Sequence, residues 1–362
     1  MQVFLRAVLA AVFGLVVCVQ AGHAASQAGV GFAVKRPVLG GSCKACPWGA
    51  LGDIVKQAVQ PYGWDIQMCY NCAGGTQEAR IVSGAMRPPP APKEVNAGQA
   101  ALGLTLDATP PPPDGPVDIG ITQNTFLQWA YHGTGDFKGE APRTNIRLIA
   151  NITTPYYLTV AVRTDLGVTD LAQLKAKRWP VKILWDDRLQ PGVAKDVLAY
   201  YGITQADVEA AGGKILNSTT PADRRDFDVA VFVSDRSGAP EFVVGYEVTA
   251  RFDLTYLTMP QPLLAKLVND HDMRPMTMPM GYYRGVGQTI ATVGWVGNSL
   301  YGRTDTPDAF AYAAAKALYE QQELLAFGLQ QFAYVPQTVW KVGDVPLHPG
   351  AARYYREMGF MK

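Results

Sequence analysis

Four cysteines in the chain form two pairs with the same Cys-x-x-Cys spacing, one in the stretch 40–46 and one in the stretch 69–76. They are Cys43, Cys46, Cys69 and Cys72. Four thiolates brought together can hold a tetrahedral zinc ion, another soft metal ion or an iron–sulfur cluster. The same pairs can also form two disulfides, or one pair can act as a redox dithiol if one thiol is exposed and has a low pKa.

The N-terminus favours disulfides as the first interpretation. Arg6 is followed by the apolar run Ala7–Val19 and then by small residues, which is the pattern of a secretory signal peptide over residues 1–24. This run is too short for a stable membrane anchor, and no later run reaches the roughly 20 apolar residues of a spanning helix. We therefore expect a periplasmic protein that does not span the membrane, in an oxidising compartment. No cofactor is expected, with zinc or another soft metal at the four cysteines as the alternative.

The elements around the cysteines predict where the two loops lie. Each loop follows a strand-like run, Phe32–Val34 or Asp65–Met68, and precedes a helix-like run, Ala50–Val59 or Glu78–Ser83. In open α/β sheets, ligands bind at the carboxyl ends of the strands, near the N-termini of the helices that follow. Both loops should therefore contribute to one site, and their cysteines should form one cluster.

Other polar and aromatic residues recur at predicted strand ends. Arginines that follow the runs Val181–Leu184 and Asp228–Val233 could clamp a carboxylate, although a solvated arginine is equally typical of such loops. Aromatic residues could wall a pocket or simply belong to the core. The predicted ligand-binding set is Gly41, Ser42, Trp48, Gly75, Thr76, Gln123, Asn124, Tyr156, Tyr157, Asp187, Arg188, Gln190, Asp235, Arg236 and Tyr282.

Strand-like and helix-like runs alternate through most of the chain, which predicts an α/β fold with two lobes, each a mainly parallel sheet flanked by helices, and a ligand cleft between them. Lobe 1 should comprise residues 28–156, with a proline-rich insertion at 87–116, and lobe 2 residues 157–288. Residues 289–362 should return to lobe 1 and end in C-terminal helices. The link Asn151–Tyr157, between predicted strands at 146–150 and 158–162, should carry the first crossing between lobes.

The composition argues against two classes of function, nucleic-acid binding and binding to a membrane surface. The chain has 362 residues, of which 48% are hydrophobic and 17% charged, and its 32 basic and 31 acidic residues are well mixed. This balance provides no basic surface for nucleic acid and no polybasic membrane patch. We find no nucleophile elbow, metalloprotease motif or phosphate-binding loop, so we expect a binding protein rather than an enzyme.

Four stretches resemble the TAXI family of solute-binding proteins from TRAP transporters, in the order in which that family has them: Gly74–Glu78, Asp118–Asn124, Asp170–Arg178 and the tail Pro346–Gly359. The resemblance covers nearly the whole chain after the signal peptide. It implies a two-lobed periplasmic binding protein of type II, which captures a small molecule such as an organic acid and delivers it to a TRAP-type membrane permease. We expect a monomer.

The chain departs from the family in the loops that would hold the ligand. Both lobe 1 loops contain cysteines, and Leu189-Gln190-Pro191-Gly192 stands where the family often has a Gly-Ser-Gly-Thr cradle for anions. The ligand is therefore not identified by the resemblance. A metal-binding or thiol-redox protein on the same scaffold is the alternative.

Overall fold

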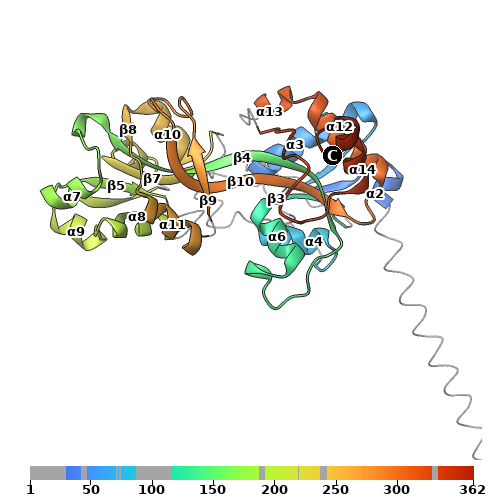
Figure 1. Ribbon diagram of the computed structural model, residues 1–362, viewed down its shortest axis with the longest axis horizontal. Coiled ribbons are helices and arrows are strands. Elements are labelled where there is room, and N and C mark those ends of the chain that lie inside the picture. Colours follow the sequence, from blue (N-terminus) through green and yellow to red (C-terminus); the bar gives the residue numbers. More distant parts are fainter. Residues whose placement is uncertain are drawn as a thin grey trace, which may run out of the picture.

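The computed structural model describes residues 30–41, 47–70, 72, 75–86, 116–186, 192–218, 220–236, 243–271, 273–327 and 333–362. In this part of the chain two α/β lobes lie side by side, joined by two long strands, β4 and β10 (Figure 1). The predicted signal peptide and almost all of the proline-rich insertion lie outside the described residues. No described helix has the length and apolar character that a membrane-spanning helix requires.

The strands of lobe 1 are β1 (Val38–Gly40), β2 (Gln67–Cys69) and β3 (Ile119–Gln123), together with the first half of β4 (Ile146–Arg163) and the second half of β10 (Ile290–Arg303). The remaining halves of β4 and β10 belong to lobe 2. Its other strands are β5 (Lys182–Trp185), β6 (Lys214–Asn217), β7 (Val229–Ser234), β8 (Leu254–Tyr256) and β9 (Arg274–Met278).

Helices cover the sheet in both lobes. Those of lobe 1 are α2 (Val30–Ala33), α3 (Pro47–Val59), α4 (Thr76–Val82), α6 (Asn124–His132), α12 (Asp308–Glu320), α13 (Glu323–Phe327) and α14 (Pro349–Glu357). Those of lobe 2 are α7 (Ala172–Lys177), α8 (Val193–Tyr200), α9 (Gln205–Ala210), α10 (Val243–Arg251) and α11 (Gln261–Asp270).

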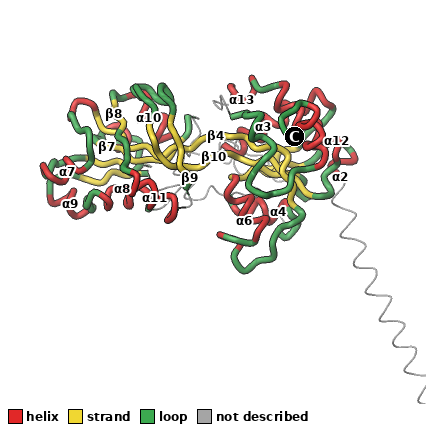
Figure 2. Tube along the Cα trace, in the orientation of Figure 1, coloured by secondary structure: helices red, strands yellow, loops and turns green. Residues whose placement is uncertain are grey.

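One mixed sheet of ten described strands runs through both lobes, in the order β2-β1-β3-β10-β4-β7-β5-β6, with β8 paired to β4 and β9 to β10 (Figure 2). Strands β2, β1 and β3 are parallel to one another, and so are β7, β5 and β6. The two long strands are antiparallel to each other and to these groups. The predicted α/β fold with two lobes is thus confirmed. The predicted separate, mainly parallel sheet in each lobe is wrong, because the antiparallel strands β4 and β10 continue from one lobe into the other and join all the strands in one mixed sheet.

The predicted break between two strands at Asn151–Tyr157 is wrong, because these residues belong to the single 18-residue strand β4, which itself runs from one lobe to the other (Figure 1). Pro155 lies inside this strand, although proline cannot donate to a β-ladder. Pro155 pairs with Val296 of β10 on one side, whereas pairing with β7 on the other side begins only at Tyr157. On the edge of β4 that faces β7, no described strand is paired at Pro155, so the missing N–H of proline costs no ladder hydrogen bond there.

The predicted strand Phe32–Val34 is also wrong. These residues form the end of helix α2 and the turn after it, and the strand begins later, at Val38. Phe32 packs in lobe 1, with its ring centroid 5.3 Å from that of Phe310 and 6.3 Å from that of Trp64. In so short a segment, an apolar residue can pack from a helix as well as from a strand. The hydrophobic pattern therefore could not distinguish a helix from a strand here.

The core of each lobe lies on both faces of the shared sheet. Along β4, Leu158, Val160 and Val162 pack into one apolar cluster of lobe 2, while Tyr157 and Ala161 pack into another. This alternation follows the two-residue period of a strand with helices on both faces. The sheet therefore fixes where the residues at the lobe junction point.

A ligand cavity at the lobe junction

Strand register makes the carboxyl ends of the parallel strands face one another across the junction. Gln123, the last residue of β3, pairs with Asn298, which in turn pairs with Ile152 of β4. Ser234, the last residue of β7, pairs with Tyr157 of the same strand. At about 3.3 Å per residue, these two positions on β4 lie about 17 Å apart. The loops that follow the strands of both lobes thus open onto the same gap.

A cavity of about 490 Å³ lies at this junction, within the size range of small-molecule sites. The long strands, lobe 2 and one residue of lobe 1 all contribute to its wall. The lining residues are Thr153, Thr154, Pro155, Tyr157, Asp235, Arg236, Met276, Pro279, Met280, Gly281, Tyr282, Val296 and Ala333.

Four residues of the predicted ligand-binding set line this cavity: Tyr157, Asp235, Arg236 and Tyr282. The rings of Tyr157 and Tyr282 meet edge to face with their centroids 4.7 Å apart, and the Arg236 guanidinium lies 5.9 Å from the centroid of Tyr282. Burial raises the pKa of both phenols, so both hydroxyls stay protonated and can donate hydrogen bonds at neutral pH. Asp235 is buried and gives the wall a carboxylate next to this aromatic corner.

Trp48 and Tyr156, two further residues of the predicted set, meet through a residue that the sequence did not suggest. The Trp48 indole N–H donates to Oδ1 of Asn298 at 2.9 Å, and the amide of Asn298 donates to the Tyr156 hydroxyl at 2.9 Å. Asn298 is fully buried. This chain of hydrogen bonds ties the first turn of α3 to both long strands, so Trp48 and Tyr156 position the junction rather than line its cavity.

Asn124 lies in a second polar cluster on lobe 1. Its amide donates to Oδ1 of Asn151 at 2.8 Å, and its own Oδ1 accepts from the hydroxyl of Ser299 at 2.6 Å. Asn124 lines an adjoining cavity of about 260 Å³ rather than the first one. Gln123 lies beside it at the end of β3.

Three residues of the predicted set line neither of these two cavities: Gly41 directly follows β1, and Gly75 and Thr76 begin helix α4. The Gly41 N–H donates to the carbonyl of Cys69 at 3.3 Å. Gly75 has a φ of 60° and accepts from the Thr122 hydroxyl at 3.3 Å. The Thr76 hydroxyl accepts from Arg80 of the same helix at 3.3 Å. Gly75 and Thr76 thus shape the start of α4, and Gly41 connects the end of β1 to β2.

The other residues of the predicted set, Ser42, Asp187, Arg188 and Gln190, lie outside the described residues, as do Cys43 and Cys46. Ligand binding by all members of the set stays a prediction.

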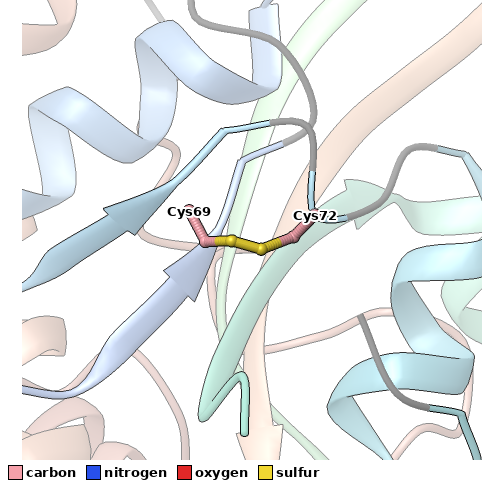
Figure 3. The surroundings of a disulfide bond; sticks show 2 residues. All are labelled: Cys69 and Cys72. Carbon is pink, nitrogen blue, oxygen red and sulfur yellow. A yellow bond between two sulfur atoms is a disulfide. The ribbon is translucent and has the colours of Figure 1, made fainter. Parts of the chain in front are cut away.

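Cys69 and Cys72 form a disulfide, with their Cα atoms 5.6 Å apart, at the end of β2 (Figure 3). Both residues are completely buried, in the cluster that includes Val82 and Leu127. The sequence left open whether disulfides form within a Cys-x-x-Cys pair or between the two pairs, and this bond is within a pair. The single-cluster prediction is untested, because it also requires the positions of Cys43 and Cys46.

A buried carboxyl group under the same loop was missed. Glu78, in the first turn of α4, is 1% exposed, and the Tyr301 hydroxyl donates to its Oε1 at 3.5 Å. Burial raises its pKa well above the usual value. Burial likewise raises the pKa of Asp118 to about 6, against the opposing effects of the Val38 N–H and Arg303. The glutamate stood in the stretch Gly74–Glu78, but nothing in its spacing indicated that it is buried.

Met276 of β9 and three cavity residues of the following loop, Pro279, Met280 and Gly281, were also missed, although Tyr282 of the same loop was predicted. Neither the Arg274–Met278 segment nor its neighbours show a clear strand pattern, and they lie more than a hundred residues from Tyr157 in the sequence. The polar step Asn298-Ser299 inside an otherwise apolar run was the one available signal for the junction cluster.

Residues 113–359 match the NMT1-like family, and the chain belongs to this family. Similar solved structures include MatC from Rhodopseudomonas palustris with bound malate, which is 10% identical with a TM-score of 0.41 and covers 84% of this chain and 90% of that one. A TRAP periplasmic solute-binding protein from Rhodobacter sphaeroides is 13% identical with a TM-score of 0.35, covering 82% of each chain. The binding-protein component of an ABC phosphonate transporter from Pseudomonas aeruginosa is 14% identical, with a TM-score of 0.33 and coverage of 82% and 80%. At these identities and TM-scores, none of the three indicates what this chain binds.

Proposed function

We propose that the protein is an extracytoplasmic solute-binding subunit of a transporter of the TRAP type, of the TAXI kind, which captures a small molecule at the lobe junction and delivers it to a membrane permease. The observation that carries this proposal is the cavity of about 490 Å³ between the lobes. Membership of the NMT1-like family and the four stretches that resemble TAXI proteins support it.

Binding would act through the two long strands. The cavity wall combines Arg236 and Tyr282 of lobe 2 with Thr153 of the connecting strand and Ala333 of lobe 1. A ligand that contacts all of these groups favours the closed state, in which the groups lie close together, over the open state. The shift in free energy equals the difference between the ligand's binding free energies for the two states. No bond needs to be made or broken for this function.

The test is a thermal-shift screen of the mature protein against a library of small organic acids, amino acids, amines and sugars. A ligand present at about 100 times its Kd adds roughly 2.7 kcal/mol to stability, which raises the Tm by several degrees. Tyr282→Ala should remove this shift, because it opens the aromatic corner of the cavity. Tyr200→Ala, on the exposed side of α8, is the matched control and should retain it.

A library in which no compound raises the Tm of the wild-type protein would count against solute binding. Transport is tested separately, by uptake into vesicles that carry a TRAP-type permease, with and without the added protein. Uptake that does not depend on the protein would contradict the transport assignment even if the ligand binds.

The alternative, a metal-binding or thiol-redox protein, draws on the disulfide between Cys69 and Cys72. Both sulfur atoms are buried, so exchange with an external thiol would require the loop to open. A four-thiolate metal site would require the same bond to be reduced. Thiol titration and metal analysis of the purified protein distinguish two disulfides, free thiols and bound metal.

A further inference from the structure

The cavity at the lobe junction lies next to the second, smaller cavity. The two share Thr153 and Val296 in their walls. Alternate residues of a strand point to the same face, so Thr153, Pro155 and Tyr157 of β4 form one continuous surface. In the same way, Met276 and Arg274 of β9 follow each other on one face, the first in the larger cavity and the second in the smaller.

The two cavities differ in chemistry. The larger one is walled mainly by aromatic and aliphatic groups, including Tyr157, Tyr282, Met276 and Met280. The smaller one, of about 260 Å³, is lined by two cationic side chains, Arg274 and Lys341, and by two amides. Among the described residues, neither cation has an ion-pair partner.

Hydrogen bonds already present explain why the cations, rather than the amides, would bind a ligand. The amide of Asn151 donates to the carbonyls of Thr338 at 3.2 Å and Lys341 at 3.0 Å. The amide of Asn124 donates to Asn151. Both amides are therefore engaged in holding the wall, and the bond to its carbonyl fixes the backbone of Lys341. The donors left to face the cavity are charged, which favours an anion over a neutral polar group.

Resting on the proposed function, we propose that the joined cavities take one elongated small molecule, with an apolar or aromatic body in the larger cavity and an anionic head group between Arg274 and Lys341. Carboxylates, sulfonates and phosphonates share the chemistry that these two cations would recognise. The wall of the larger cavity selects for the body, because Tyr157, Tyr282 and the methionines present aromatic and aliphatic surface from which an apolar group displaces water.

The proposal is tested with probes that share one body and differ in the head. Binding of 4-phenylbutanoate, 3-phenylpropylphosphonate, 3-phenylpropan-1-ol and 3-phenylpropan-1-amine to the mature protein is measured by calorimetry at low and high salt. We expect the two acids to bind at least tenfold more tightly than the alcohol and the amine, and to weaken as salt rises. Comparison of the two acids identifies which anion is preferred.

Two variants assign the head group to its site. Arg274→Gln and Lys341→Gln should each weaken the acids about tenfold or more while leaving the alcohol unchanged. Lys214→Gln, which removes an exposed cation of the distant strand β6, is the matched control and should have no effect. Because Arg274 and Lys341 are exposed, the variants should melt like the wild type without ligand.

Three outcomes would each overturn the proposal. The acids could bind no more tightly than the alcohol, both variants could keep the wild-type affinity for the acids, or neither acid could bind. These outcomes leave the proposed function standing if the library screen has identified another ligand whose effect Tyr282→Ala removes. A screen without any ligand, by contrast, would contradict the proposed function itself.

Discussion

Replacing Asn298 by alanine should destabilise the lobe junction strongly. Its side chain is fully buried and connects the Trp48 indole N–H to the Tyr156 hydroxyl, both at 2.9 Å. The truncation leaves one donor and one hydroxyl without this partner, and an unsatisfied buried polar group costs about 1–3 kcal/mol. Trp48 is only partly buried, so water can compensate for part of its loss. We therefore expect a loss of about 2–4 kcal/mol, a large fraction of the 5–15 kcal/mol that is typical of folded proteins.

Urea denaturation of the mature protein, followed by tryptophan fluorescence and circular dichroism, measures this loss. A double-mutant cycle assigns it to the hydrogen bond: Trp48→Phe should cost less in the Asn298→Ala background than in the wild type, by about 1 kcal/mol. Asn269→Ala, at an exposed position of α11, is the control and should stay within about 0.5 kcal/mol of the wild type. An Asn298→Ala protein as stable as that control, or a cycle with no coupling, would refute the reasoning.

Three further predictions concern buried groups of lobe 1 and Gly297, where the pairing of β10 with β4 shifts register between Val296 and Asn298. Because its pKa is raised, Glu78 binds its proton more tightly in the native state than in the unfolded state. Its contribution to stability is therefore greatest below the usual pKa of 4.5 and is lost as the pH rises. Glu78→Gln should flatten this decline in a series of Tm measurements from pH 5 to 8. Replacing both Cys69 and Cys72 by alanine should cost about 2 kcal/mol in urea denaturation, from the loop entropy of so short a bridge, and an unchanged midpoint would contradict this estimate. Gly297 has a φ of +85°, and an added Cβ would lie 2.3 Å from the side-chain amide nitrogen of Asn124. Gly297→Ala should therefore lower the Tm more than the control Gly139→Ala. Gly139 has a similar φ of +91°, but nothing lies within 4 Å of an added Cβ there.

Much of the architecture could be predicted because it depends on local patterns. The continuous apolar run before Asp235 indicated a buried parallel strand, and β7 lies there. The helix predicted after the first cysteine pair is α3, which begins three residues before the predicted start at Ala50. Such runs carry their own structural signal, whatever they later pack against.

The site could be predicted only in part, because its residues meet through pairings distant in sequence. Tyr157 and Tyr282 were chosen as aromatic residues near a lobe boundary, and both line the cavity. Arg274 and Ala333 had no such local signal, and β9 brings the first of them to the junction only by pairing with β10. The continuity of β4 through Pro155 also has no local signal, because the cost of a proline in a strand depends on which edge of the strand is paired.

The position of β10 in the sheet has a consequence for the order in which the chain can fold during synthesis. This strand lies between β3 and β4, and it also pairs with β9, although it is made after all three. Until residues 290–303 have emerged, β3 and the first half of β4 have no strand between them, and each exposes an edge that could pair with another chain. The segment with β5, β6 and β7 can assemble on the second half of β4 much earlier. Lobe 1 would thus be the last to be completed, and the chain would be most prone to aggregation just before its final fifth is made.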